Sequence, residues 1–129
     1  MKATKIMYWT TTIIVALMMT YSTYAYLTKA AAEQGFQHLG YPGYFRVELA
    51  MAKLTGAILL LAPIAGRIKE WAYAGFFFTF ISAFIAHTAS GDPLVYRLNP
   101  IIFLVILLVS YFTYHRLHKE EEKAFVQHA

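Results

Sequence analysis

Four long stretches of this chain are almost free of charged residues. Three of them contain no Asp, Glu, Lys or Arg: residues 6–28, 71–91 and 98–114. The fourth, residues 47–66, contains only Glu48 and Lys53. A helix needs about 20 apolar residues to cross the hydrocarbon core of a bilayer, and backbone in lipid must satisfy its own hydrogen bonds. The sequence therefore predicts an all-α fold, a transmembrane four-helix bundle with spans at about residues 6–28, 45–65, 71–90 and 98–115.

These stretches take up most of the 129 residues, so little chain is left for a soluble domain. Only 14% of the residues are charged, whereas a soluble domain carries about 25%. We therefore expect one membrane domain over residues 1–129, in which residues 116–129 form a cytoplasmic helical tail. The chain contains no cysteine, which excludes disulfides, thiol redox chemistry and thiolate metal sites within it.

The basic residues are distributed unevenly over the two ends of the predicted bundle. Four spans place both termini and the middle loop on one side, with seven basic residues: Lys2, Lys5, Arg67, Lys69, Arg116, Lys119 and Lys123. The other side holds three: Lys29, Arg46 and Arg97. An excess of Lys and Arg marks the cytoplasmic face, so both termini are expected in the cytoplasm. This topology accounts for the net charge of +4, and the expected partner is the lipid bilayer rather than nucleic acid.

Lys53 is the charge that most needs an explanation. A lysine at the centre of a bilayer costs about 2.5–3.5 kcal/mol on insertion scales, and such residues mark sites or face wet cavities. Helical side chains lean toward the N-terminus of their own helix. Lys53 on a helix that starts outside therefore leans toward the outer surface, and His87 on a helix that starts inside leans toward the middle of the bilayer. We expect the two side chains to meet in the outer half of the bundle.

Asp92 lies five residues after His87 and extends this candidate site. It either completes a Lys53–His87–Asp92 polar chain or serves as the counter-ion, so these three residues are the predicted ligand-binding pocket. Glu48 is a weaker candidate, because five residues separate it from Lys53 and place it about 140° away around the helix. No catalytic residues and no metal site are expected.

Each of these residues also has a simpler interpretation. Lys53 can extend its ammonium group to the outer interface, His87 can be an interhelical hydrogen-bond partner, and Asp92 before Pro93 can belong to a turn. His115, His118 and Glu122 share one helix face and form a possible metal set, although such exposed side chains are usually solvated.

Small residues predict how the helices pack, because membrane helices associate where small side chains let backbones approach. The third span carries such a stripe: Gly75, Thr79, Ser82, Ala83, Ala86 and Ser90. Its opposite face is expected toward lipid or a partner: Phe76, Phe77, Phe80, Phe84 and Ile85. Phe36 and Leu39, in the first loop, are expected on the outer membrane surface.

Four segments together resemble one protein family: Leu39-Gly40-Tyr41-Pro42, Ala52-Lys53-Leu54-x-Gly56-Ala57, Lys69-Glu70-Trp71-Ala72-Tyr73-Ala74-Gly75 and His87-x-x-x-Gly91-Asp92-Pro93. With them, residues 10 to about 114 resemble the DoxX-like family. The resemblance implies a small four-helix protein of the bacterial inner membrane. It also implies that Lys53, His87 and Asp92 occupy the polar positions of the family, whereas Glu48 departs from its apolar pattern.

The resemblance directs the functional expectations. Relatives are associated with quinol oxidases, thiosulfate–quinone chemistry and membrane-bound oxidative-stress complexes, so a quinone is a possible ligand and a lipid is another. The absence of cysteine argues against a sulfur-handling role. The alternative is a non-enzymatic assembly module that binds a membrane protein partner or a second copy of itself. A transporter is less favoured, because no pair of discontinuous helices is visible.

Overall fold

The computed structural model describes residues 2–64 and 66–127, and in these residues it contains helices but no strand. The helices are α1 (Lys2–Thr28), α2 (Ala30–His38), α3 (Gly43–Leu61), α4 (Arg67–Ala89) and α5 (Leu94–Gln127). Each predicted span coincides with one of the long helices, and α2 is an additional short helix. Residue 65, at the end of the second predicted span, and residues 128–129 of the predicted tail lie outside the described residues.

Two helices of the described chain, α4 and α5, are long and apolar enough to cross a membrane. Helix α3 falls short because Arg46, Glu48 and Lys53 interrupt its apolar sequence, and α1 is rich in threonine and tyrosine. The all-α fold is thus confirmed. Of the four predicted spans, those that correspond to α4 and α5 have the length and composition that a membrane span requires.

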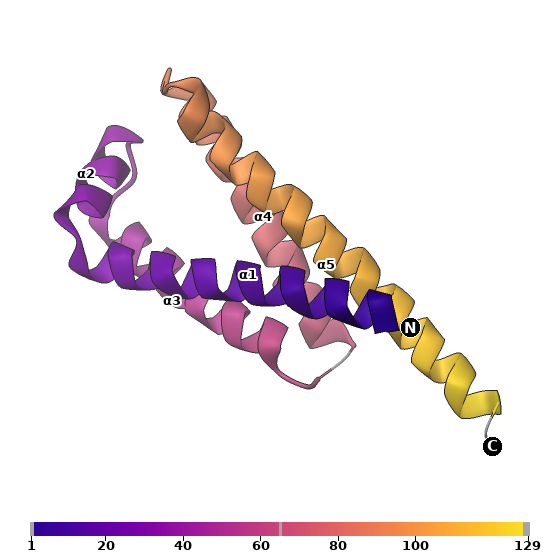
Figure 1. The fold of residues 1–129 in the computed structure, drawn as a ribbon. Helices are drawn as coiled ribbons and strands as arrows, with labels where there is room; N and C mark the ends of the chain where they lie inside the picture. The colour runs from indigo at the N-terminus through magenta and orange to yellow at the C-terminus, as the bar shows by residue number, and fades with distance from the viewer. Residues whose placement is uncertain (1, 65, 128–129) are drawn as a thin grey trace.

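The four long helices pack as two pairs. Helix α1 packs against α3, and α4 packs against α5, while α1–α5 and α3–α4 contacts join the pairs. The pairs lie close together near the N-terminus of α1 and diverge toward α2 and the α4–α5 turn (Figure 1). Helix α2 packs only against α3 and α1 among the described helices.

A three-way contact between hydroxyl groups holds the close end together. The Ser110 hydroxyl of α5 lies 2.6 Å from that of Thr12 on α1 and 2.7 Å from that of Tyr73 on α4. All three side chains are buried. Since a buried hydroxyl without a partner is costly, this contact fixes the register of three helices at once.

Helix α4 packs differently from the sequence prediction. Phe76 and Phe80, expected on the outer face, are buried in the core. The Phe76 ring lies directly over Gly56 of α3, where a Cβ atom would come within 2.6 Å of it. The small residue that permits close approach is therefore on α3, and α4 supplies the large ring that fills the space.

Helix α2 brings Phe36 into the protein rather than onto the membrane surface. Phe36 is buried, and its ring packs against those of Tyr26, Tyr41 and Phe45 at centroid distances of 4.9, 5.9 and 6.2 Å. The expectation that Phe36 lies on the surface is wrong, because α2 packs against α3 and α1 and holds the Phe36 ring against them.

Lys69, counted as a loop charge in the topology prediction, lies within α4 and caps α3. Its side chain is 1% exposed, and Nζ donates hydrogen bonds to the carbonyls of Leu59, Leu60 and Ala62 at 3.2, 2.6 and 2.9 Å. The last carbonyls of a helix lack intrahelical partners, and a cation is favoured at this end of the helix dipole. Lys69 therefore joins the end of α3 to the start of α4.

Replacing Lys69 by methionine keeps the length of the side chain but removes all three hydrogen bonds. We expect Lys69→Met to lower the free energy of unfolding by about 2–3 kcal/mol, because hydrogen bonds to charged groups contribute about 1.5–3 kcal/mol. Thermal unfolding in a mild neutral detergent measures the change. Lys119→Met, at an exposed position of α5, is the matched control, and equal stabilities of the two variants would contradict the capping role.

Candidate functional site

The turn between α4 and α5 fixes Asp92 beside His87. The N–H of Gly91 donates to the Thr88 carbonyl at 3.1 Å, and the N–H of Asp92 donates to the His87 carbonyl at 3.0 Å. With Gly91 at φ +70°, this is the Schellman ending of a helix, and Pro93 prevents the helix from continuing. The closeness of His87 and Asp92 follows from this local ending.

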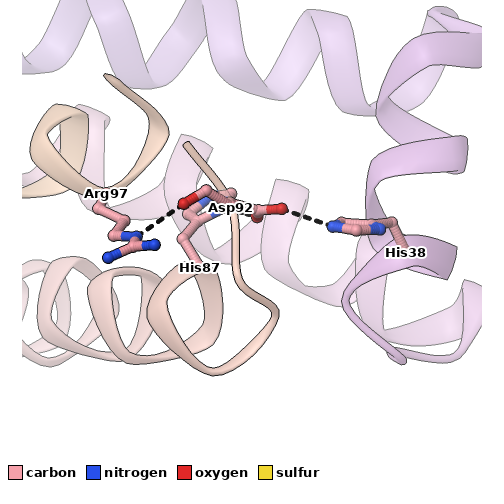
Figure 2. Close-up of polar contacts among 4 residues, drawn as sticks. All are labelled: His38, His87, Asp92 and Arg97. Carbon is pink, nitrogen blue, oxygen red and sulfur yellow. Dashed lines mark hydrogen bonds and ion pairs between the residues drawn. The ribbon is translucent and has the colours of Figure 1, made fainter. Parts of the chain in front are cut away.

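Asp92 binds two histidines from different parts of the chain. His87 Nδ1 lies 2.6 Å from Asp92 Oδ2, and His38 Nε2, at the end of α2, lies 2.6 Å from Asp92 Oδ1. Figure 2 shows the carboxylate between His38 on one side and His87 with Arg97 on the other. Arg97 Nε donates to the Asp92 backbone carbonyl at 2.7 Å. The carboxylate thus connects α2 to the α4–α5 turn.

These contacts favour the charged form of Asp92. The hydrogen bond with His87, followed by the one with His38, holds the pKa of Asp92 below its ordinary value of 3.8. The Asp92 side chain is only 11% exposed, so the two histidines take the place of much of its water. Asp92 is therefore a fixed anion at this end of the molecule.

Lys53 is buried, as expected for a charge on an inward face, but its partners are on α1. The side chain is 7% exposed. Nζ donates to Tyr26 Oη at 2.7 Å and to Ser22 Oγ at 3.0 Å, and it lies 4.1 Å from the centre of the Tyr26 ring. In the described chain no hydrogen bond joins Lys53 to His87, so the expected three-residue chain is interrupted between these two residues.

Lys53 and His87 nevertheless line the same pocket, which has a volume of about 530 Å³. All five helices contribute to its wall, which includes Tyr26 of α1, Phe36 of α2 and Tyr96 of α5. The pocket opens between the α1–α3 pair and the α4–α5 pair, where the two pairs diverge. A volume of this size lies within the range of about 300–1,000 Å³ that is usual for small-molecule sites.

The small residues of α4 form one wall of this pocket. Thr79, Ser82, Ala83 and Ala86 belong to the predicted small-residue stripe, and all four line the pocket. None of them is buried against a neighbouring helix. The stripe therefore leaves open space between the helix pairs instead of bringing two backbones into contact.

The sequence model of the DoxX-like family matches residues 10–110. The chain belongs to the DoxX-like family. No curated protein and no solved structure matches it. Together with the two apolar helices α4 and α5, family membership indicates a membrane protein.

The structure places the other candidates of this DoxX-like chain outside the pocket. Glu48 is exposed on α3 and is not among the lining residues. His115 Nε2 lies 2.5 Å from Glu70 Oε1 on α4. No group of three His, Cys, Asp or Glu residues within 2–64 and 66–127 is arranged to hold a metal ion.

Sequence reasoning missed three residues of the site: Ser22, Tyr26 and His38. Ser22 and Tyr26 are four residues apart and therefore share a face of α1, a spacing that would have identified a polar patch. His38 stands two residues before Gly40, in the last turn of α2, and His87 stands four residues before Gly91, in the last turn of α4. The repeated Gly-x-Pro after both histidines was the available signal.

The lowered pKa of Asp92 makes part of the stability depend on pH. Because the pKa is lower in the folded protein than in the unfolded chain, the carboxylate stabilises the fold above pH 3.8, and this contribution is lost as the pH falls below that value. We expect the melting temperature of Asp92→Asn to lie below that of the unmodified protein near neutral pH. The difference should shrink as the pH falls below about 4.

Thermal unfolding of both proteins between about pH 3 and pH 7 measures this difference. Glu48→Gln removes an exposed carboxylate of the same charge. Its melting temperature is expected to differ from that of the unmodified protein by an amount that does not change with pH. If the difference in melting temperature between Asp92→Asn and the unmodified protein did not change with pH, the two histidines would not stabilise the charged carboxylate.

Proposed function

We propose that this DoxX-like protein binds a lipophilic ligand, a quinone or a lipid, in the pocket between its two helix pairs. The proposed setting is the bacterial inner membrane, in a redox or stress context, with all four long helices spanning the bilayer and both termini in the cytoplasm. Lys53, His87 and Asp92 are the proposed site residues.

The pocket itself is the observation that carries the proposal. Its walls are mostly apolar, with Met18, Phe78 and Phe103 among them, and only a few polar groups enter it. This combination is typical of sites for small amphiphilic molecules, because apolar walls provide affinity and the few polar groups provide orientation.

The polar groups of the pocket suit a ligand that carries hydrogen-bond acceptors. Lys53 Nζ is a donor on the α1–α3 side of the pocket. On the α4 side Asp92 binds Nδ1 of His87. Nε2 is therefore the ring nitrogen of His87 that Asp92 does not occupy. A quinone carbonyl or a lipid headgroup between the helix pairs would meet these groups, while its tail would lie along the phenylalanine rings.

The distribution of charge supports the proposed topology. With Lys69 set aside as a buried cap, six basic residues remain on the side of the termini against three on the side of α2. The same rule of cytoplasmic Lys and Arg therefore supports the proposal that the termini lie in the cytoplasm and that the pocket lies in the outer half of the membrane.

The alternative function, an assembly module for a membrane complex, has one observation in its favour. Ile68, Trp71 and Ile85 are exposed on α4 and do not line the pocket. A homo-oligomer or a membrane partner would cover such a face. In that case the molar mass measured in detergent would exceed that of the 14.7 kDa chain.

Filling the pocket tests the proposed function directly. Ala83 lies on the pocket wall of α4, so Ala83→Trp places an indole ring in the space that a ligand needs. We expect a short-chain ubiquinone or a phospholipid to raise the melting temperature of the unmodified protein in detergent. Ala83→Trp is expected to abolish this increase.

Ala31→Trp adds the same ring at an exposed position of α2 outside the pocket and is the matched control. It is expected to keep the increase in melting temperature. Stabilisation by ligand that persists unchanged in both Ala83→Trp and Lys53→Ala would place the binding site elsewhere.

A further inference from the structure

The pocket contains one positively charged side chain, that of Lys53. Of the described residues that line it, Lys53 is the one Lys or Arg, and none is Asp or Glu. The pocket therefore has a cationic centre in an apolar surrounding.

The partners of Lys53 are neutral. Nζ donates to the hydroxyl oxygens of Ser22 and Tyr26, and no ion pair of Lys53 occurs in residues 2–64 and 66–127. The two nearby acidic candidates are not available to it. Glu48 is exposed on α3, and Asp92 is bound to two histidines at 2.6 Å each.

An ammonium group in an apolar surrounding is stabilised strongly by a counter-charge. Neutral hydroxyls satisfy its hydrogen bonds, but they do not compensate its charge, and charges removed from water are normally paired. A bound anion would supply the missing charge and would gain a charge-assisted hydrogen bond to Nζ.

The hydroxyl groups add to this preference for an anion. Ser22 and Tyr26 accept hydrogen bonds from Nζ through their oxygens, so each retains its own O–H as a donor. An anionic head in front of Lys53 would thus meet up to three donors: the ammonium group and two hydroxyls. A neutral ester or ether would form weaker hydrogen bonds with these donors than an anionic head.

We propose that the ligand is an anionic amphiphile, whose carboxylate or phosphate head binds Lys53, Ser22 and Tyr26. Its hydrocarbon chain lies along the apolar walls formed by the methionine and phenylalanine side chains of α1, α4 and α5. This inference rests on the proposed function, because it assigns the charge of the ligand that the same pocket binds.

Matched probes that differ only in their heads test the inference in the unmodified protein. Purified protein in a neutral detergent is saturated with radiolabelled oleic acid, which is then displaced by unlabelled oleic acid, methyl oleate or oleyl alcohol. We expect the acid to bind about tenfold or more tightly than the ester or the alcohol, as for hydrogen bonds that involve charged groups. This comparison requires no variant and therefore does not depend on how well a variant folds.

Variants then assign the preference to Lys53. Lys53→Met should reduce the preference for the acid to about twofold or less, whereas Lys53→Arg should retain most of it, because it keeps the charge. Tyr26→Phe removes one donor and is expected to weaken binding of the acid several-fold. Lys29→Met, at an exposed lysine outside the pocket, should leave all affinities unchanged.

A second pair of probes distinguishes the two sources of an anionic head. Oleoyl lysophosphatidic acid carries a phosphate monoester, and oleoyl lysophosphatidylcholine carries the same chain on a zwitterionic head. Tighter binding of the former than of oleic acid would identify a phosphate ligand, and the reverse order would identify a carboxylate.

The outcomes separate this inference from the proposed function. Equal affinity for oleic acid and methyl oleate, or a preference that survives Lys53→Met, overturns the anionic ligand while leaving a lipophilic pocket intact. If none of these probes binds and no quinone raises the melting temperature, the proposed function fails, and the inference fails with it.

Discussion

Polar groups inside this apolar molecule need partners, and the position of those partners determines how the helices lie. The hydroxyls of Thr12, Tyr73 and Ser110 satisfy one another and join α1, α4 and α5 at one end. At the other end the contact between Asp92 and His38 joins the short helix α2 to the α4–α5 turn, while the long helices of the two pairs diverge. The pocket lies at this second end. The need of buried hydroxyls for partners therefore closes one end of the bundle, and the end without such a contact has room for a ligand.

The long helices and the turn at Asp92 were predictable from the sequence, because both depend on local rules. Windows without charge mark the helices, and the glycine followed by a proline after His87 marks the ending that brings Asp92 back to it. The contacts of Lys53 with Ser22 and Tyr26 join residues 31 and 27 positions apart. They depend on the rotation of α3 against α1, which no local rule determines.

The prediction of which face of α4 packs against the other helices was wrong for a similar reason, because it also depends on the partner helix. Small residues were expected to mark the face where helices touch, but helices also touch where one large ring covers one glycine. Phe76 over Gly56 is such a contact, and it turns the small residues of α4 toward the pocket. Thr79 and Ala83 were correctly recognised as one face of the helix, although what that face adjoins depends on the partner helix.

The contact of Asp92 with both His38 and His87 has a consequence for how a ligand would travel. It ties the end of α2 to the α4–α5 turn, and Phe36 and Leu39 beside it contribute to the pocket wall. In the proposed topology this link crosses the water-facing end of the pocket. A hydrophobic ligand would then enter laterally from the bilayer, between the diverging helix pairs, without passing through water.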